Sequence, residues 1–214
     1  MGFEGDKVIR ETQAKGHGYK VLARSALPVD TVEFARYLIG KVVVRETAKG
    51  VLSGRIVETE AYPVGDAAGH AYRGETARNR ALFLDRGHAY VYLAYGVSWM
   101  MNVSSEAAGV GAGVLIRALA PLQGIALMQE NRHVQNLRDL ARGPGRLAVA
   151  LDIDRRLDGA DLCRRGPLWL ARDGFDSPDV GKSTRIGLTR EADRLLRFYL
   201  RGDSFVSGPK VLNR

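Results

Sequence analysis

The sequence predicts an α+β fold: a single domain with a curved, mostly antiparallel β-sheet flanked by helices. The chain has 214 residues, enough for one full core and tight for two. Strand-like segments follow one another in the middle of the chain instead of alternating strictly with helices, which favours antiparallel pairing. We find no internal repeat and no linker long enough to divide the chain.

The first elements can be placed from turn and cap signals. Residues 1–20 mix Gly, Lys and Glu with little periodicity, which predicts a flexible basic N-terminal arm before a single domain over 21–214. A helix is expected within 27–41, where Asp30 is a plausible N-cap and Gly40 a stop signal. Its apolar stripe would consist of Val32, Phe34, Ala35, Leu38 and Ile39.

A hairpin is predicted over 41–62, with its turn at Lys49-Gly50. It is followed by a long polar loop over 63–87, of the kind that often carries function. Further strands are expected at 88–95, 99–105, 112–119, 167–172, 184–188 and 197–202. Helices are expected at 120–132, with Pro121 near the first turn, and at 143–153.

Composition limits the classes of partner. The net charge of +8 and pI of about 9.8 favour a polyanionic partner. One cysteine, Cys163, rules out an internal disulfide framework, and four scattered histidines give no metal-ligand spacing, so we expect neither metal nor cofactor. The sequence has no apolar run long enough to span a bilayer and no signal-peptide core. A location in the cytoplasm is expected, with the nucleoid in a bacterium, or in the nucleus of a eukaryote.

The stretch "RIVETEAY" places two acids, Glu58 and Glu60, two residues apart in a predicted strand. Side chains alternate in a strand, so both carboxylates should point to the same face. One interpretation is a solvated strand face whose acids pair with arginines, and the other is a site where one acid does chemistry. Arg117, in the otherwise apolar "GVLIRAL", would be their partner.

Three tyrosines in "AYVYLAYG" allow two interpretations. Tyr90 and Tyr92 share a face, and Tyr95 lies where the chain turns at Gly96. They are either core aromatics or a platform for stacking bases, with Tyr95 as a wedge. Asn102, among apolar residues, is either a satisfied core amide or a pocket residue.

Several motifs, in this order and spacing, resemble the alkyladenine (3-methyladenine) DNA glycosylase family. The resemblance covers roughly residues 20–206 and rests on "GRIVETEAY", His70, "RNR" at 78–80, "YVYLAYG", "MNVSS", "VLIRAL", "GPGRLAVAL", "RIGL" and "LRFYLRG". It implies that residues 21–214 form a DNA glycosylase domain, which acts as a monomer on double-stranded DNA containing damaged bases, away from membranes and without a metal or other cofactor.

The resemblance also implies a role for each matching residue. Glu60 would be the catalytic base, and Arg117 and the carbonyl of Leu188 would help it to hold the attacking water. Tyr62, His70 and Tyr92 would sandwich and contact the flipped base, while Asn102 would reject guanine through its exocyclic amino group. Tyr95 would insert into the duplex where the base left.

The chemistry of the residues is compatible with this resemblance. A base inside a duplex must be flipped out before it can be cut. Hydrolysis of the N-glycosidic bond builds positive charge on the sugar, which a carboxylate stabilises. The motif run 54–117 contains no lysine, which argues against an amine nucleophile and lyase activity. Arg146, at the start of the predicted helix 143–153, is a candidate phosphate anchor, although an ordinary helix start is an equally good interpretation.

Two other functions remain open at this point. A nucleic-acid-binding module without catalysis would also be basic and rich in tyrosine, but a glutamate in its binding face would repel phosphate. A glycoside or nucleoside hydrolase could use Glu58 and Glu60, which would lie about 6.6 Å apart along a strand, near the separation of an inverting pair. Both acids would then lie on one side of the sugar, which inversion cannot use.

Overall fold

The computed structural model describes residues 18–176 and 178–213 and confirms the α+β class. Most of the predicted arm (1–17) lies outside the described residues, and β1 (Lys20–Val21) already pairs with β7 (Leu168–Arg172). Among the described helices, none combines the length and apolar content needed to cross a membrane.

The nine strands found in the described residues form one sheet, and every pair is antiparallel. The main path runs β1-β7-β2-β3-β6-β5-β4, and β9 with β8 branches from β3. The remaining strands are β2 (Val42–Thr47), β3 (Gly50–Tyr62), β4 (Ala89–Ala94), β5 (Ser98–Ser104), β6 (Gly113–Gln123), β8 (Val180–Ser183) and β9 (Arg197–Leu200).

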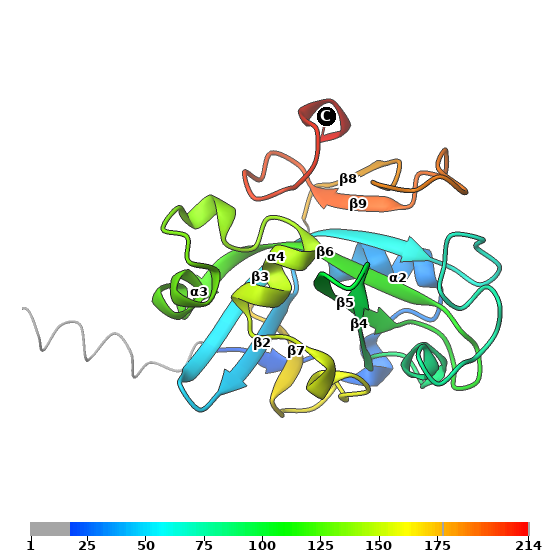
Figure 1. Ribbon diagram of the computed structural model, residues 1–214, viewed down its shortest axis with the longest axis horizontal. Coiled ribbons are helices and arrows are strands. Elements are labelled where there is room, and N and C mark those ends of the chain that lie inside the picture. The colour runs from blue at the N-terminus through cyan, green and yellow to red at the C-terminus, as the bar shows by residue number, and fades with distance from the viewer. Residues whose placement is uncertain (1–17, 177, 214) are drawn as a thin grey trace, which may run out of the picture.

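Strand β3 is the centre of the sheet. One of its edges pairs with β6, while the other pairs first with β2 and then, at residues 58–60, with β9. Figure 1 shows β8 and β9 at the top of the molecule, apart from the β2–β7 end of the sheet. The part of β3 that contains the two glutamates is therefore enclosed by strands on both sides.

Helix α2 (Thr31–Leu38) begins as predicted, because the Asp30 carboxylate accepts hydrogen bonds from the amides of Val32 and Glu33. Gly40, with a φ of +86°, ends the turn that follows it. Helix α4 (Pro144–Ala150) also lies where a helix was predicted.

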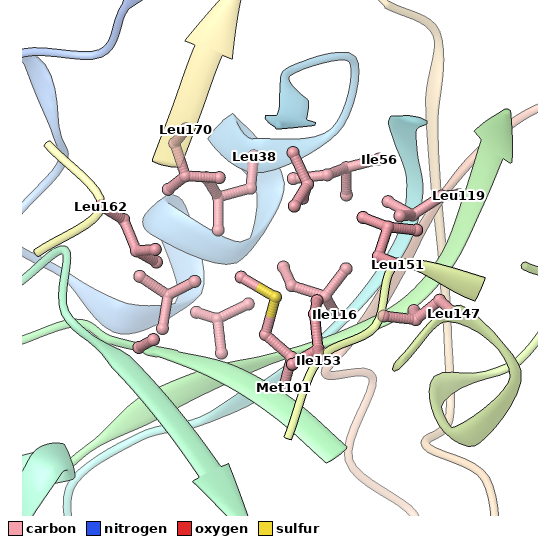
Figure 2. Close-up of a cluster of buried hydrophobic side chains, with 14 of the residues drawn as sticks. Leu38, Ile56, Met101, Ile116, Leu119, Leu147, Leu151, Ile153, Leu162 and Leu170 are labelled. Carbon is pink, nitrogen blue, oxygen red and sulfur yellow. The ribbon is translucent and has the colours of Figure 1, made fainter. Parts of the chain in front are cut away.

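The core lies between the sheet, α2 and α4. Figure 2 shows side chains from α2, β3, β5, β6, β7, the region of α4 and the segment before β7 meeting in one cluster: Leu38, Ile56, Met101, Ile116, Leu119, Leu147, Leu151, Ile153, Leu162 and Leu170. All of these are almost completely buried.

One predicted helix begins later than expected, and one predicted strand was wrong. Residues 120–123 continue β6, and α3 (Ile125–Arg132) begins only after Gly124, whose φ is +74°. Pro121 is tolerated in the strand because β5 pairs only with residues 113–115 of β6, which leaves an open edge. Residues 184–188 are not a strand: β8 ends at Ser183, and the segment forms a loop beneath the site described below.

Asp30→Ala should lower the free energy of unfolding by about 1 kcal/mol, because two amides of the first turn of α2 lose their acceptor. Denaturant unfolding followed by circular dichroism measures this change. Asp30→Asn, which keeps a capping oxygen, should remain close to the wild type. Equal stability of all three proteins would contradict the capping role.

Candidate active site

The centre of the site is a buried pair of acids joined by one arginine. Glu58 and Glu60 both have 0% exposed surface, so the interpretation as a solvated strand face was wrong. Arg117 lies between them: its Nε donates to Oε1 of Glu58 at 2.8 Å, and its Nη1 lies 3.2 Å from Oε1 of Glu60. The predicted pairing of Arg117 with both acids is thus confirmed.

The backbone explains how one arginine reaches both acids. The β3–β6 register shifts on either side of Glu58, leaving Val57 and Arg117 without a direct partner in the ladder. Such bulges redirect a side chain and often occur beside active sites. Burial alone would lower the pKa of Arg117, but the two glutamates raise it, so the guanidinium stays charged.

Glu58 is saturated with donors. Besides Arg117, Oε1 accepts from Arg197 Nε at 2.8 Å and from the Ser207 hydroxyl at 3.0 Å, and Oε2 accepts from the Ser207 amide at 2.6 Å. Burial alone would raise the pKa of Glu58, but the charges of Arg117 and Arg197 and these hydrogen bonds hold it below its ordinary value. Glu58 is therefore a fixed anion that orients Arg117.

Glu60 has different neighbours. Oε1 accepts from the Ile186 amide at 2.8 Å, and Oε2 accepts from the Tyr62 hydroxyl at 2.9 Å. Tyr62 lines a cavity of about 200 Å³, so it connects Glu60 to that space. Of the two acids, Glu60 is the one placed next to the pocket.

This cavity, here called the aromatic pocket, contains most of the residues that the sequence singled out. Tyr62, His70, Tyr92, Tyr95, Asn102 and Leu188 all line it, together with Tyr90 and Leu115 from β4 and β6. The predicted functional loop 63–87 supplies one side, which includes Asp66, Gly69 and His70.

The aromatic rings of the pocket pack closely. The His70 and Tyr92 ring centroids are 4.4 Å apart, edge to face, and Tyr90 stacks on Tyr92 at 5.2 Å. The His70 Nδ1 lies 3.0 Å from the Tyr90 hydroxyl. This bond fixes the orientation of the imidazole, although the tautomer is not defined by it.

The imidazole and phenol rings that line the pocket favour their uncharged forms near neutral pH. Burial, followed by the charge of Arg78, lowers the pKa of His70, which favours neutral imidazole. Burial also raises the pKa of Tyr92, and that of Tyr90 to about 12. It raises the pKa of Tyr62 as well, with a further contribution from the neighbouring charge of Glu60. The pocket therefore offers flat, neutral rings, which suit a planar aromatic ligand.

Asn102 is held in the pocket wall by its position in β5. It pairs with Tyr90 of β4 and Leu115 of β6, and its Nδ2 donates to the Tyr90 carbonyl at 3.3 Å. Its side chain is both anchored and part of the lining.

Tyr95 is 97% exposed, which excludes the interpretation as a core aromatic. It lies at the tip of the β4–β5 hairpin, where Tyr95 and Gly96 have φ values of +51° and +71° and the Val97 amide donates to the Ala94 carbonyl at 2.9 Å. A bulky residue in the left-handed region is uncommon. The tight turn thus projects a bare aromatic ring into solvent at the mouth of the aromatic pocket.

Arg146 does not line the aromatic pocket. It is half exposed on α4 and forms an ion pair with Asp139 at 3.1 Å. The preceding residue, Gly145, lies against Ser98 at the base of the Tyr95 hairpin. Arg146 is therefore close to the hairpin in the fold but separate from the pocket.

Sequence reasoning missed one contact and one group of the site. Tyr90 was expected either in the core or as part of a stacking platform, and its hydroxyl is also the partner of the His70 imidazole. The Ile186 amide, which holds Glu60, is a backbone group and so leaves no signal in residue types. Among the described residues, no three histidine, cysteine, aspartate or glutamate side chains gather as metal ligands.

Comparison with known proteins gives one consistent result. A chain from Mesorhizobium japonicum, named "Putative 3-methyladenine DNA glycosylase", is 67% identical over 94% of this chain and 97% of its own length. Identically named chains from Paraburkholderia phytofirmans (51% identity, 89% of this chain and 90% of the relative) and Methanoculleus marisnigri (45%, 83% and 94%) are also similar. The model of the family described as methylpurine-DNA glycosylase (MPG) matches residues 15–204. The expected resemblance is confirmed, and the chain belongs to the methylpurine-DNA glycosylase family.

Proposed function

We propose that this DNA glycosylase flips damaged purines out of duplex DNA and hydrolyses their N-glycosidic bond with a water activated by Glu60. Alkylated purines such as 3-methyladenine are the first candidates, with hypoxanthine and ethenoadenine as neutral alternatives. The released base would leave an abasic site and so begin base excision repair. The proposal rests on one observation: a buried carboxylate lies beside a pocket lined with aromatic rings, and an exposed tyrosine lies at the mouth of that pocket.

In this mechanism, the flipped base stacks between Tyr62 and the His70–Tyr92 wall, where Asn102 opposes the exocyclic amino group of normal guanine. Glu60, Arg117 and the Leu188 carbonyl hold a water beneath the sugar. As the bond breaks, its electron pair leaves with the base and positive charge develops on the sugar, which the Glu60 carboxylate stabilises. The water oxygen bonds to C1′ and its proton passes to Glu60.

Glu58 would be a positioning residue in this scheme. Its carboxylate already accepts four hydrogen bonds and is closed off by Arg197 and Ser207. This acid is also completely buried and does not line the pocket, so it is not placed to contact a substrate, which argues against a glycosidase with two catalytic acids.

The basic surface around the pocket supports a DNA substrate. A groove beside the aromatic pocket contains Arg73, Arg78 and Arg190, and Arg146 flanks the Tyr95 hairpin from α4. We infer that these arginines face phosphates. The described residues of one chain supply the whole pocket, in keeping with a monomer that acts on the chromosome in the cytoplasm.

Wild-type protein should release hypoxanthine or an alkylated purine from duplex DNA. Glu60→Gln replaces the proposed base with an amide of similar shape, so it should abolish release while binding to the lesion-containing duplex stays nearly intact. Single-turnover release from damaged duplex, undamaged duplex and free nucleoside measures this. Release from nucleoside alone would indicate a nucleoside hydrolase, and binding without release would indicate a non-catalytic module.

Glu58→Gln is the matched control for Glu60→Gln. It removes the buried negative charge that Arg117 and Arg197 share, so it should mainly lower the free energy of unfolding, by about 3–5 kcal/mol, with a smaller effect on release per folded molecule. Retention of activity in Glu60→Gln together with an inactive, stable Glu58→Gln would reverse the two assignments.

Tyr95→Ser should leave the melting temperature unchanged, because the ring is exposed, but reduce release from matched duplex. The lost stacking is about 1–3 kcal/mol, or up to about a hundred-fold in the flipping equilibrium. The defect should shrink when the lesion lies opposite a mismatch, since such a base is already easier to extrude. Tyr92→Ser, which alters the pocket, should show no such relief. Equal Tyr95→Ser defects in matched and mismatched duplex would contradict the wedge.

Binding to undamaged duplex should weaken steeply with salt, and Arg146→Gln should reduce the slope of log K against log[salt] by about one. Arg156→Gln is the control, since Arg156 is also exposed and ion-paired but lies beside Lys49 at the other end of β3. Equal slopes for the two variants would remove Arg146 as an anchor, and a flat salt response of the wild type would argue against DNA binding.

A further inference from the structure

The stacking residue Tyr62 is backed by a buried cation. The Arg185 guanidinium lies 4.6 Å from the centre of the Tyr62 ring and its side chain has 0% exposed surface. Arg185 does not line the aromatic pocket, whereas Tyr62 does. The cation is therefore on the side of the ring that is turned away from the ligand space.

The cation is locked in place. The Arg185 Nη1 lies 2.6 Å from Asp66 Oδ2 and donates to the Ala61 carbonyl, and Nη2 donates to the Glu191 carbonyl. Its buried Nε finds no hydrogen-bond partner among the described residues. The ion pair with Asp66 and the two carbonyls thus hold the guanidinium against the Tyr62 ring, where its charge acts on that ring.

A cation over one face of an aromatic ring is attracted by the electron density of that ring. The electron density of the ring is then less available to attract a second cation on the opposite face. A neutral purine does not depend on that attraction and still stacks. Arg185 should therefore weaken the stacking of a positively charged base on Tyr62 more than that of a neutral base.

We propose that Arg185 is a specificity-determining residue that shifts the aromatic pocket away from cationic N-alkylpurines and toward neutral damaged purines. The inference rests on the proposed function, since it concerns which bases that pocket accepts. Asp66 sets the size of the effect, because its charge partly offsets that of Arg185.

The residues that follow Arg185 in the chain also contact the site. Ile186, next to Arg185, donates its amide to Glu60, and Leu188 lines the pocket. The segment 185–188 thus contacts both the stacking residue and the acid. A variant that merely disturbs this segment should reduce release of every base by the same factor. A change in specificity should instead alter the ratio between two bases.

The test is the ratio of single-turnover release of 3-methyladenine, which is cationic while it is attached to the sugar, to that of hypoxanthine, a neutral base, after spontaneous loss is subtracted. Arg185→Met should raise this ratio about five-fold, the effect expected of one cation–π contact of moderate strength. The effect of Arg185→Met on this ratio is measured in two backgrounds, the wild type and Asp66→Asn. The side-chain oxygen of asparagine at position 66 can still accept the hydrogen bond from the Ala68 amide. Either background gives the comparison if one variant fails to fold.

A matched control pair lies elsewhere in the fold. Arg55 stacks on Phe175 at 4.2 Å and pairs with Asp173 through two hydrogen bonds, away from the pocket lining. Arg55→Met, alone and with Asp173→Asn, should leave the release ratio unchanged.

An unchanged ratio for Arg185→Met in both backgrounds, with equal loss on both bases, would overturn the inference and leave Arg185 a support of the loop. Wild-type protein that releases neither base would instead overturn the proposed function.

Discussion

The contact on which the site depends is the guanidinium of Arg117 held between Glu58 and Glu60. Two carboxylates on neighbouring same-face positions of a buried strand repel each other and are costly to bury unless a cation is shared between them. Arg197 and Ser207 supply the remaining donors for Glu58. This leaves Glu60 with one shared cation, one amide and one hydroxyl, and places it beside the aromatic pocket.

The fold explains why this arrangement forms at one point of β3. Only there does β9 replace β2 on one edge while the β6 register shifts on the other. The same strand continues to Tyr62, and β4 and β5 bring Tyr92 and Asn102 to the pocket. A rigid sheet thus fixes the acid and the stacking rings, while the loop 63–87 and the segment 185–188 close the pocket around them.

The sequence predicted those elements of the fold that are decided by local residue patterns. Strand-like runs on both sides of the Lys49-Gly50 turn predicted the hairpin of β2 and β3, and Asp30 with Gly40 predicted α2. Local pattern failed where tertiary pairing competes with it: residues 120–123 extend β6 beside β3 in spite of Pro121, and residues 184–188 leave the sheet to contact Glu60 and Tyr62. The Ile186 amide and the position of Arg185 depend on that loop, and no spacing in the sequence reveals them. Figure 1 shows β8 and β9, the strands on either side of this loop, at the opposite end of the molecule from β2 and β7.

The most direct measurement of the central claim is a crystal structure of the Glu60→Gln variant bound to a duplex with one damaged purine. We expect the purine in the aromatic pocket between Tyr62 and Tyr92, Tyr95 in the gap left in the duplex, and residue 60 next to the sugar with Arg117 beside it. A base that remains stacked in the helix, or a sugar that lies against some other part of the surface, would exclude Glu60 as the catalytic residue.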